Sequence, residues 1–348
     1  MNRRNGMLRA VSAIAALGLA QTLPQASAFA QEIKLTFADQ NSATGWGPKN
    51  ALYPWIKQVE EATKGRIKMQ VYPSQTLVKG IDMWKAAAAG TIDIGWCVQS
   101  YWPDNTPLSD VISLPGMPFK TAEKTSEVLW KLYEKYPAIQ AEYKQVQPLA
   151  LYTATPFFII SSKKMIKTLE DVKGMKVRIV GGPATEHAKA LGIVPTPMPM
   201  PDVYQALDKG VIDGAGAPWE AVHAFRLYEV GKYVTLAPLA TVYFSICANR
   251  AKIASLPADV REQLMSVGGL KGSMFWGKSF FDSAEAGVYD DLKAANRQIE
   301  KFEISGAERD RWVKAAEPIH EEWVKRMEGK GHKEAREILN TTISMLKQ

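Results

Sequence analysis

Cysteine and histidine are scarce in this chain of 348 residues, which contains two cysteines and four histidines. Two cysteines are too few for a fold held together by disulfides. The histidines (His187, His223, His320 and His332) are not paired at metal-ligand spacing, so we expect no metal site. The sequence has no C-x-x-C pair, G-x-S-x-G elbow, P-loop or complete dinucleotide-binding turn. We therefore predict no cofactor and find no nucleophile–base pair.

Long basic blocks are missing as well. The formal net charge is +7, but Arg3, Arg4 and Arg9 contribute three of these charges and no acidic residue precedes position 31, so the rest of the chain carries 7 − 3 = +4. Lysines and glutamates are mixed along the helical patterns, which is typical of a solvated surface. We expect no nucleic-acid partner.

After position 30, no apolar run is long enough to cross a membrane. The first thirty residues resemble a Sec-type signal peptide, because the basic Met1–Arg9 precedes a short apolar run at Ala10–Ala20. Small residues allow cleavage after Ala30 or Ala28. We expect an exported protein; the alternative is that the segment stays as an uncleaved anchor.

Periodicity predicts an α/β fold. Strand patterns at 32–38, 67–72 and 91–98 alternate with helical patterns at 49–63 and 81–89, which favours a mostly parallel sheet. The same order returns between 149 and 215. After a strand at 243–249 the chain is mainly helical, with a long segment at 272–298 and capping-box spacing from Ser305 to Glu308.

One element occurs twice. D-M-W-K-A-A-A-A-G-T-I-D-I-G begins at Asp82 and D-V-Y-Q-A-L-D-K-G-V-I-D-G-A begins at Asp202, and 202 − 82 = 120 residues separate the copies. Each predicts a helix capped by its aspartate, closed by Gly90 or Gly210 and followed by a strand. The repeat favours two similarly built domains.

Cys97 and Cys247 both lie in strand patterns. In an exported protein they form a disulfide if they meet in space, and otherwise they are two small buried hydrophobic residues.

Arg178 is the most informative residue, because it lies in an apolar strand pattern that ends at Gly181-Gly182-Pro183. A buried guanidinium needs an anion, which is either an internal carboxylate or a ligand. Ligands of open α/β sheets bind beyond the carboxyl ends of the strands. Candidate contacts near such ends are Trp46, Trp96, Gln99, Tyr101, Phe157 and Trp219. An aromatic cleft with one charged anchor suits a small organic acid, whereas core packing is the alternative for each aromatic residue.

Several motifs resemble the periplasmic substrate-binding component of TRAP transporters, in the DctP-like family. They are L-E-D-V-K-G-M-K-V-R at 169–178, L-G-I-V-P-T-P-M-P at 191–199, V-Y-Q-A-L-D-K-G-V-I-D-G at 203–214, and L-Y-E-V-G-K-Y at 227–233. W-I-K-Q-V-E-E-A-T-K-G-R-I-K-M-Q-V-Y-P at 55–73 and A-A-A-A-G-T-I-D-I-G at 86–95 agree more loosely. In this family, the arginine at the place of Arg178 typically pairs with the ligand carboxylate.

The resemblance implies a two-domain, type II-like periplasmic-binding-protein fold with a ligand cleft, hinge strands and a long helix spanning both domains. We expect domain I at 31–154 plus about 245–283, and domain II at 155–244 plus about 284–348. The implied function is capture of a small organic anion by a protein that is not an enzyme, followed by delivery to the small and large TRAP permease subunits. We expect a monomer.

Two departures from the family pattern bear on the ligand. Many acid-binding members carry a G-F-R-like segment where this chain has Thr155-Pro156-Phe157, and an Asn where it has Ala217. These losses favour an aromatic or keto monocarboxylate over a dicarboxylate or sialic acid, although a sulfonate could use the same arginine. The rival functions are a periplasmic enzyme using His187 or His223 and the binding protein of an ATP-driven importer.

Overall fold

The computed structural model describes residues 32–348. The predicted signal peptide at 1–30, with cleavage after Ala30 or Ala28, lies outside the described residues. Among those that are described, none of the helices combines the length and the apolar character needed to cross a bilayer.

The first sheet has the strand order β2–β1–β3–β10–β4. Its strands are β1 (Ile33–Ala38), β2 (Ile67–Tyr72), β3 (Ile94–Val98), β4 (Val146–Thr153) and β10 (Tyr243–Asn249). β1 is parallel to β2 and β3, as predicted, but β10 is antiparallel to β3 and β4. The sheet is mixed rather than mostly parallel, because β10 arrives from the second sheet and not from a crossover helix of the first.

The second sheet has the order β11–β9–β5–β8–β6–β7. Its strands are β5 (Phe158–Ser161), β6 (Lys176–Arg178), β7 (Val194–Pro195), β8 (Gly214–Ala217), β9 (Tyr233–Leu236) and β11 (Glu300–Glu303). It is also mixed: β6 is parallel to β7 and β8, whereas β5 is antiparallel to β8 and β9.

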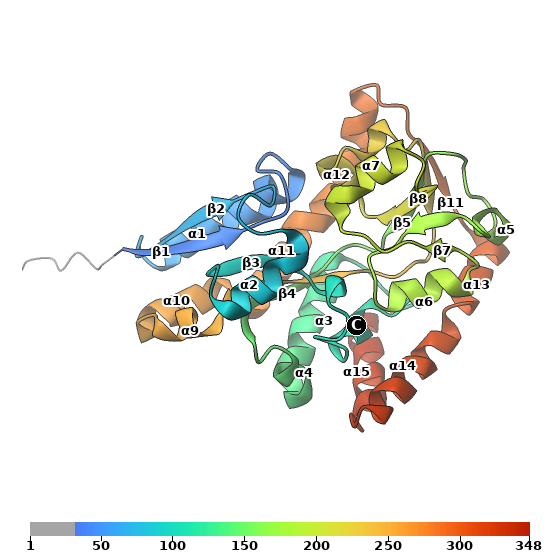
Figure 1. Cartoon of the computed structure of the whole chain (residues 1–348). Coiled ribbons are helices and arrows are strands. Elements are labelled where there is room, and N and C mark those ends of the chain that lie inside the picture. Colours follow the sequence, from blue (N-terminus) through green and yellow to red (C-terminus); the bar gives the residue numbers. More distant parts are fainter. Residues whose placement is uncertain (1–31) are drawn as a thin grey trace, which may run out of the picture. The chain divides into compact units, whose positions relative to one another are not determined.

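Helices pack around both sheets (Figure 1). They are α1 (Tyr53–Ala62), α2 (Met83–Ala89), α3 (Ala122–Lys135), α4 (Pro137–Glu142), α5 (Leu169–Val172), α6 (Pro183–Ala190), α7 (Val203–Asp208), α8 (Trp219–Ala224), α9 (Arg250–Ser255), α10 (Ala258–Val267), α11 (Gly269–Trp276), α12 (Ser283–Ala294), α13 (Gly306–Lys314), α14 (Glu317–Gly329) and α15 (Ala335–Lys347).

Two extended segments connect the sheets. Residues 154–157 join β4 to β5, and residues 237–242 join β9 to β10. The segments are hydrogen-bonded to each other, since the Ala154 N–H donates to Val242 O at 2.9 Å and the Phe157 N–H donates to Ala240 O at 3.2 Å. These are the expected hinge strands: a few connecting residues there can absorb a rotation of one sheet against the other.

One long helix serves both sheets. α11, the π-helical residues 277–282 and α12 follow one another without a break. α11 packs on α3 and β4 of the first sheet, and α12 packs on α8, which follows β8 of the second (Figure 1). A side chain at Gly277 would place its Cβ 2.6 Å from Ala122 O, so the close approach to α3 requires glycine there.

The last helices differ from the expected division of the chain, which assigned 284–348 to domain II. Trp312 of α13 is buried with side chains of the second sheet, such as Val177. In contrast, Trp323 of α14 and Leu339 of α15 are buried in the first core, with Leu129 of α3. The apolar face of α15 packs on α3 and on α14, and the contact with α3 is one that the linear sequence does not reveal.

The repeat at Asp82 and Asp202 is visible in the fold. Both copies form a short helix, α2 or α7, closed by a glycine at φ +77° (Gly90) or +68° (Gly210) and followed by β3 or β8. The aspartate caps were wrong, because neither Asp82 nor Asp202 makes a side-chain cap hydrogen bond.

The last aspartate of each copy has a shared role. Asp93 accepts the Thr36 N–H of β1, and Asp213 accepts the Lys176 N–H of β6, both at 2.8 Å. Each aspartate thus ties the repeated element to the neighbouring parallel strand.

The predicted capping box at Ser305 does not form either. Glu308 instead accepts the Leu169 N–H at 2.6 Å and the Trp312 indole N–H at 3.2 Å. A tertiary contact with the start of α5 has replaced the local cap.

Cys97 and Cys247 form a disulfide between the adjacent antiparallel strands β3 and β10. It resolves the alternative left open by the sequence: the two residues are buried and also covalently joined.

Candidate functional site

A cavity lies where strand ends and following loops of the two sheets meet. Its empty volume is about 480 Å³, which includes space open to solvent. β3 and the segments that follow β1 and β3 contribute Gln40, Asn41, Trp96, Val98 and Tyr101. The remaining lining residues are Phe157, Arg178, Val180, Met200, Gly216, Pro218, Glu220, Ala221, Phe225, Val242, Phe244 and Phe281. Most of this lining is apolar.

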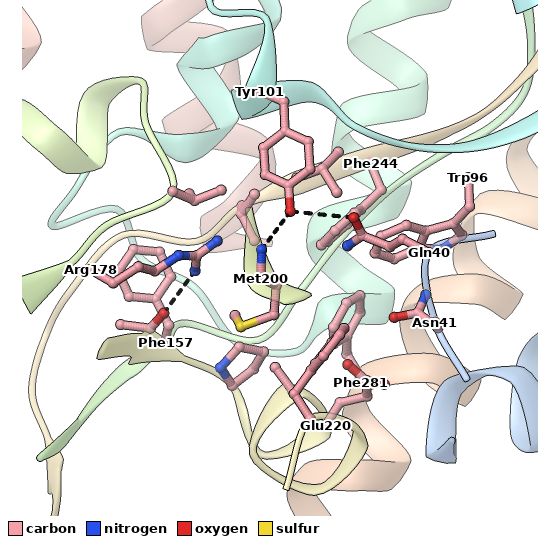
Figure 2. Close-up of a pocket in the computed structure, with 17 residues that line it drawn as sticks. Gln40, Asn41, Trp96, Tyr101, Phe157, Arg178, Met200, Glu220, Phe244 and Phe281 are labelled. Atoms are coloured by element: carbon pink, nitrogen blue, oxygen red, sulfur yellow. Dashed lines mark hydrogen bonds between the residues drawn. The ribbon is translucent and has the colours of Figure 1, made fainter. Parts of the chain in front are cut away.

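Arg178 ends β6 and is 3% exposed. Its Nε donates to Met198 O at 3.0 Å and its Nη1 donates to Gly216 O at 3.2 Å, so two carbonyl groups hold the guanidinium in place. Figure 2 shows the second of these bonds. Burial lowers the pKa of Arg178 from its ordinary value, while the field of Tyr101 opposes this shift. An arginine stays charged even when buried, so an anion beside it would be strongly favoured.

The internal-carboxylate alternative has no support in the described residues. The ion pairs between residues 32 and 348 include none with Arg178. Two carbonyl dipoles do not neutralise a full charge. The pocket therefore presents a buried cation to whatever enters it.

Tyr101 bridges the two halves of the cavity. Its hydroxyl accepts the Met200 N–H at 2.9 Å and lies 3.4 Å from Gln40 Oε1 (Figure 2). Met200 belongs to the segment that follows the second-sheet strand β7, whereas Tyr101 follows β3 of the first sheet. This hydrogen bond holds the cavity walls together.

Aromatic rings form the apolar part of the site. The ring centroids of Trp96 and Phe244 are 4.7 Å apart, and those of Phe244 and Phe281 are 5.1 Å apart. Phe157 lies on the Arg178 side (Figure 2). These faces suit a flat or apolar molecular body.

The side opposite Arg178 is polar and acidic. Gln40 and Asn41 line it, and Glu220 is 4% exposed at its edge (Figure 2). Burial raises the pKa of Glu220 from 4.5 to about 8, with nearby Asp39 adding to the shift. Burial also raises the pKa of Asp39 from 3.8 to about 7, although the hydrogen bonds from Asn41 oppose it.

Of the seven residues selected from the sequence, four line the cavity: Arg178, Trp96, Tyr101 and Phe157. The other three lie elsewhere. Trp219 is packed between Phe158 and Tyr289, with ring centroids 4.7 and 5.2 Å away. Trp46 donates its indole N–H to Ser283 Oγ at 2.8 Å, and buried Gln99 donates to Ser245 Oγ. These three side chains make internal contacts and do not line the cavity.

The polar lining residues were missed by sequence reasoning. Gln40 and Asn41 directly follow β1, and Glu220 begins α8 just beyond β8. The rule that ligands bind beyond the carboxyl ends of strands would have found all three. The repeat was a second signal for lining residues. At its spacing of 120 residues, each of three positions after Gly95 corresponds to a position after Ala215. These pairs are Trp96 and Gly216, Val98 and Pro218, and Tyr101 and Ala221. All six of these residues line the cavity.

Two α/β sheets joined by hinge strands and one long helix, with a small aromatic cavity between them, define the class of two-domain solute-binding proteins. Residues 41–326 match the model of the bacterial extracellular solute-binding protein, family 7 (DctP). The chain therefore belongs to this family.

The relatives agree with this assignment. The chain is 26% identical over 323 residues to the C4-dicarboxylate-binding periplasmic protein DctP of Rhodobacter capsulatus, covering 92% of this chain and 94% of the relative. It is also similar to a TRAP solute-binding protein of Rhodoferax ferrireducens in complex with copurified benzoate (27% identity, TM-score 0.85, 90% of this chain and 98% of the other).

A third relative is a marine metagenome TRAP solute-binding protein described as specific for aromatic acid ligands, in complex with 3-hydroxybenzoate. The identity is 28%, the TM-score is 0.85, and the match covers 91% of this chain and 98% of the other. Like these proteins, the chain is a transport solute-binding protein and not an enzyme.

Proposed function

We propose that this protein is the periplasmic component of a TRAP importer and captures an aromatic or keto monocarboxylate on Arg178. The observation that carries the proposal is a buried guanidinium with no carboxylate partner in the described chain, at one side of an aromatic cavity. The benzoate and 3-hydroxybenzoate complexes of its structural relatives support an aromatic body.

A second carboxylate on the ligand would be unfavourable. It would reach the side of the cavity that holds Glu220 with Asp39 behind it, where none of the lining residues is a cation, and a buried anion without a counter-charge is costly. Phe157 lies where many acid-binding family members carry another arginine, so the chain offers no second cation at that position. We therefore favour monocarboxylates even though one relative is named for C4-dicarboxylates.

Capture is proposed to involve closure of the two sheets about the hinge strands. The Tyr101–Met200 hydrogen bond and the aromatic faces supply contacts that exist only when the walls meet. Closure removes water from the ion pair, which strengthens the attraction between Arg178 and the carboxylate.

Export through a Sec-type signal, a monomeric state and delivery of the ligand to the small and large permease subunits belong to the same proposal. The domain division is proposed with one change from the expectation, in which α14 and α15 are grouped with the first sheet because their buried side chains pack there.

Isothermal titration calorimetry of purified protein with benzoate, phenylpyruvate and succinate tests the ligand class, after removal of copurified ligand by unfolding and refolding. We expect benzoate or phenylpyruvate to bind more tightly than succinate. Tightest binding of succinate would overturn the monocarboxylate assignment, and mass spectrometry of the ligand released by unfolding would identify the natural solute.

A further inference from the structure

The side of the cavity opposite Arg178 has its own hydrogen-bonding pattern. We propose that it is a subsite for a hydroxyl group, so that the preferred ligand is a monocarboxylate whose aromatic or keto body carries a hydroxyl far from the carboxylate. The inference rests on the proposed function, because it takes the carboxylate to be on Arg178.

Asn41 supplies the first unsatisfied atom. Its side-chain Nδ2 donates to Asp39 Oδ1 at 2.8 Å, and its backbone N–H donates to the same oxygen at 2.9 Å. These bonds fix the orientation of the amide and leave Oδ1 as a free acceptor. Asn41 is completely buried, its Oδ1 has no hydrogen-bond partner in the described chain, and the oxygen is turned toward the cavity (Figure 2).

Glu220 supplies a second. Its Oε1 is buried without a hydrogen-bond partner among residues 32–348, and the residue lines the cavity. The indole N–H of nearby Trp96 faces the buried Tyr152 hydroxyl instead. The two acceptor atoms come from the ends of separate elements, β1 and α8. Buried polar atoms are rarely left unpaired, and two at one side of a cavity indicate that a molecule in it provides their partners.

The two acceptor oxygens distinguish between chemical groups. A hydroxyl can donate one hydrogen bond to an acceptor oxygen and accept another from a protonated carboxyl group. A carboxylate has only acceptors and would face Asn41 Oδ1 and Glu220. An ammonium has only donors and brings a charge that a protonated carboxyl group does not neutralise.

The charge state of the subsite also favours a neutral group. The raised pKa values of Asp39, about 7, and Glu220, about 8, keep a large fraction of both carboxyl groups protonated near neutral pH. A neutral hydroxyl needs no counter-charge there. In the absence of ligand, water can fill a polar site of this kind.

Calorimetry with matched pairs of ligands tests the subsite. The pairs are benzoate with 3- and 4-hydroxybenzoate, and phenylpyruvate with 4-hydroxyphenylpyruvate; 4-methylbenzoate controls for the size of the hydroxyl, and 4-(aminomethyl)benzoate and terephthalate test the charged groups. We expect at least one hydroxylated acid to bind ten-fold or more tightly than its parent, and the methyl, ammonium and dicarboxylate analogues to gain nothing.

The same titrations with variants assign the atoms. Asn41→Ala and Glu220→Leu should reduce the ratio of affinities between the hydroxylated acid and its parent to about one, while the parent acid still binds. Asn340→Ala changes an exposed asparagine outside the cavity and is the matched control, with an unchanged ratio. Because the readout is a ratio within one variant, general damage to the pocket does not imitate the effect.

The outcomes separate the two proposals. If the parent acids bind and no hydroxylated acid binds more tightly, water serves the polar atoms and the subsite is wrong while the proposed function stands. If the ammonium or the dicarboxylate binds best, the subsite recognises a charged group and the hydroxyl assignment is wrong. If no carboxylate in the panel binds, the proposed function fails and the subsite fails with it.

Discussion

The two copies of the repeated element line the same cavity but differ in what they bring to it. Trp96, Val98 and Tyr101 from the first copy correspond to Gly216, Pro218 and Ala221 from the second, 120 residues later, and all of them are lining residues. The first copy contributes large aromatic side chains. The second contributes small residues and backbone.

The neighbouring strands show the reverse. In the first sheet Ala38 of β1 is paired with Gly95, and in the second Arg178 of β6 is paired with Ala215, the position equivalent to Gly95. Arg178 thus occupies the place of Ala38. Its guanidinium donates to the carbonyl of Gly216, where the first copy has Trp96. The scaffold is repeated, but large and small residues are exchanged, and this exchange creates room for one charged anchor facing an aromatic wall.

Replacing Arg178 by alanine, the residue at the equivalent position 38 of the first sheet, should have the largest effect on ligand affinity. Arg178→Ala would leave the ligand carboxylate buried without a cation, at a cost of about 2–5 kcal/mol, roughly 30- to 5,000-fold in Kd. Calorimetry with benzoate or the identified ligand measures it. Arg226→Ala is the control, because Arg226 is exposed and bonds Glu229; wild-type affinity in Arg178→Ala would contradict the anchor assignment.

The disulfide is a second asymmetry, since Cys97 corresponds to the buried Ala217. The bond joins residues 150 apart in the chain. Replacing both cysteines by alanine should lower the free energy of unfolding by about 2–4 kcal/mol, mainly through greater freedom of the unfolded chain.

Denaturant unfolding measures this loss. Ligand affinity should change little, because Cys97 is packed in a different core cluster from its strand neighbours Trp96 and Val98. Unchanged stability would show that the disulfide does not stabilise the first sheet relative to the second, which has no such bond among its described residues.

Gly181 tests the contact between the two halves. Its φ is +123°, and an added Cβ would lie 2.6 Å from Ser100 O across the cavity wall. We expect Gly181→Ala to disfavour the closed arrangement and weaken ligand binding by about 1–3 kcal/mol.

Gly174→Ala is the matched control, because Gly174 also has a positive φ, +74°, but open space around its Cβ position. Both variants should lose some stability, yet only Gly181→Ala should lose ligand affinity. Equal affinities in the two variants would argue against a closure contact at Ser100.

Glu220 corresponds to Ser100 of the first copy. Its replacement should give the smallest effect, which is on the pH dependence of the free energy of unfolding. Its pKa rises from 4.5 to about 8 on burial, so between these values the folded chain holds a proton that the unfolded chain has released. Its contribution to stability therefore falls as the pH rises through this window, by about 1 kcal/mol between pH 7 and 8.

Thermal or denaturant unfolding at pH 7 and 8, without ligand, measures this slope. Glu220→Gln should remove that share of the pH dependence. Glu170→Gln is the control, because the pKa of exposed Glu170 is lowered to about 2 by its bond with Arg311 and its window lies below pH 5. An identical slope in Glu220→Gln and the wild type would contradict the assignment.

Much of the fold could be predicted from local patterns. The strands at 67–72 and 243–249 were placed with the observed bounds, and Gly90 and Gly210 end their helices as predicted. Local hydrogen bonds to side chains were less predictable. Ser305, Asp82 and Asp202 have good capping chemistry, yet tertiary contacts and the actual helix starts left all three unused.

The site could be predicted in part. Arg178 was conspicuous because a charge in an apolar strand is costly unless an anion meets it. The aromatic residues were ambiguous, because a core and a cavity both require large apolar rings. Trp96 and Trp219 illustrate this: both are almost fully buried, but only Trp96 lines the cavity.

By itself, the sequence determined the α/β class, the two similar halves, the place of Arg178 near a strand end and, through its motifs, the family. These properties depend on periodicity and spacing, which act over a few residues. Only the tertiary structure decided which side chains share the cavity, whether Cys97 and Cys247 form a disulfide, and where α14 and α15 pack. Asn41, Trp96 and Glu220 meet because three separate chain segments end at one point, and contacts between such distant segments leave no local pattern in a single sequence.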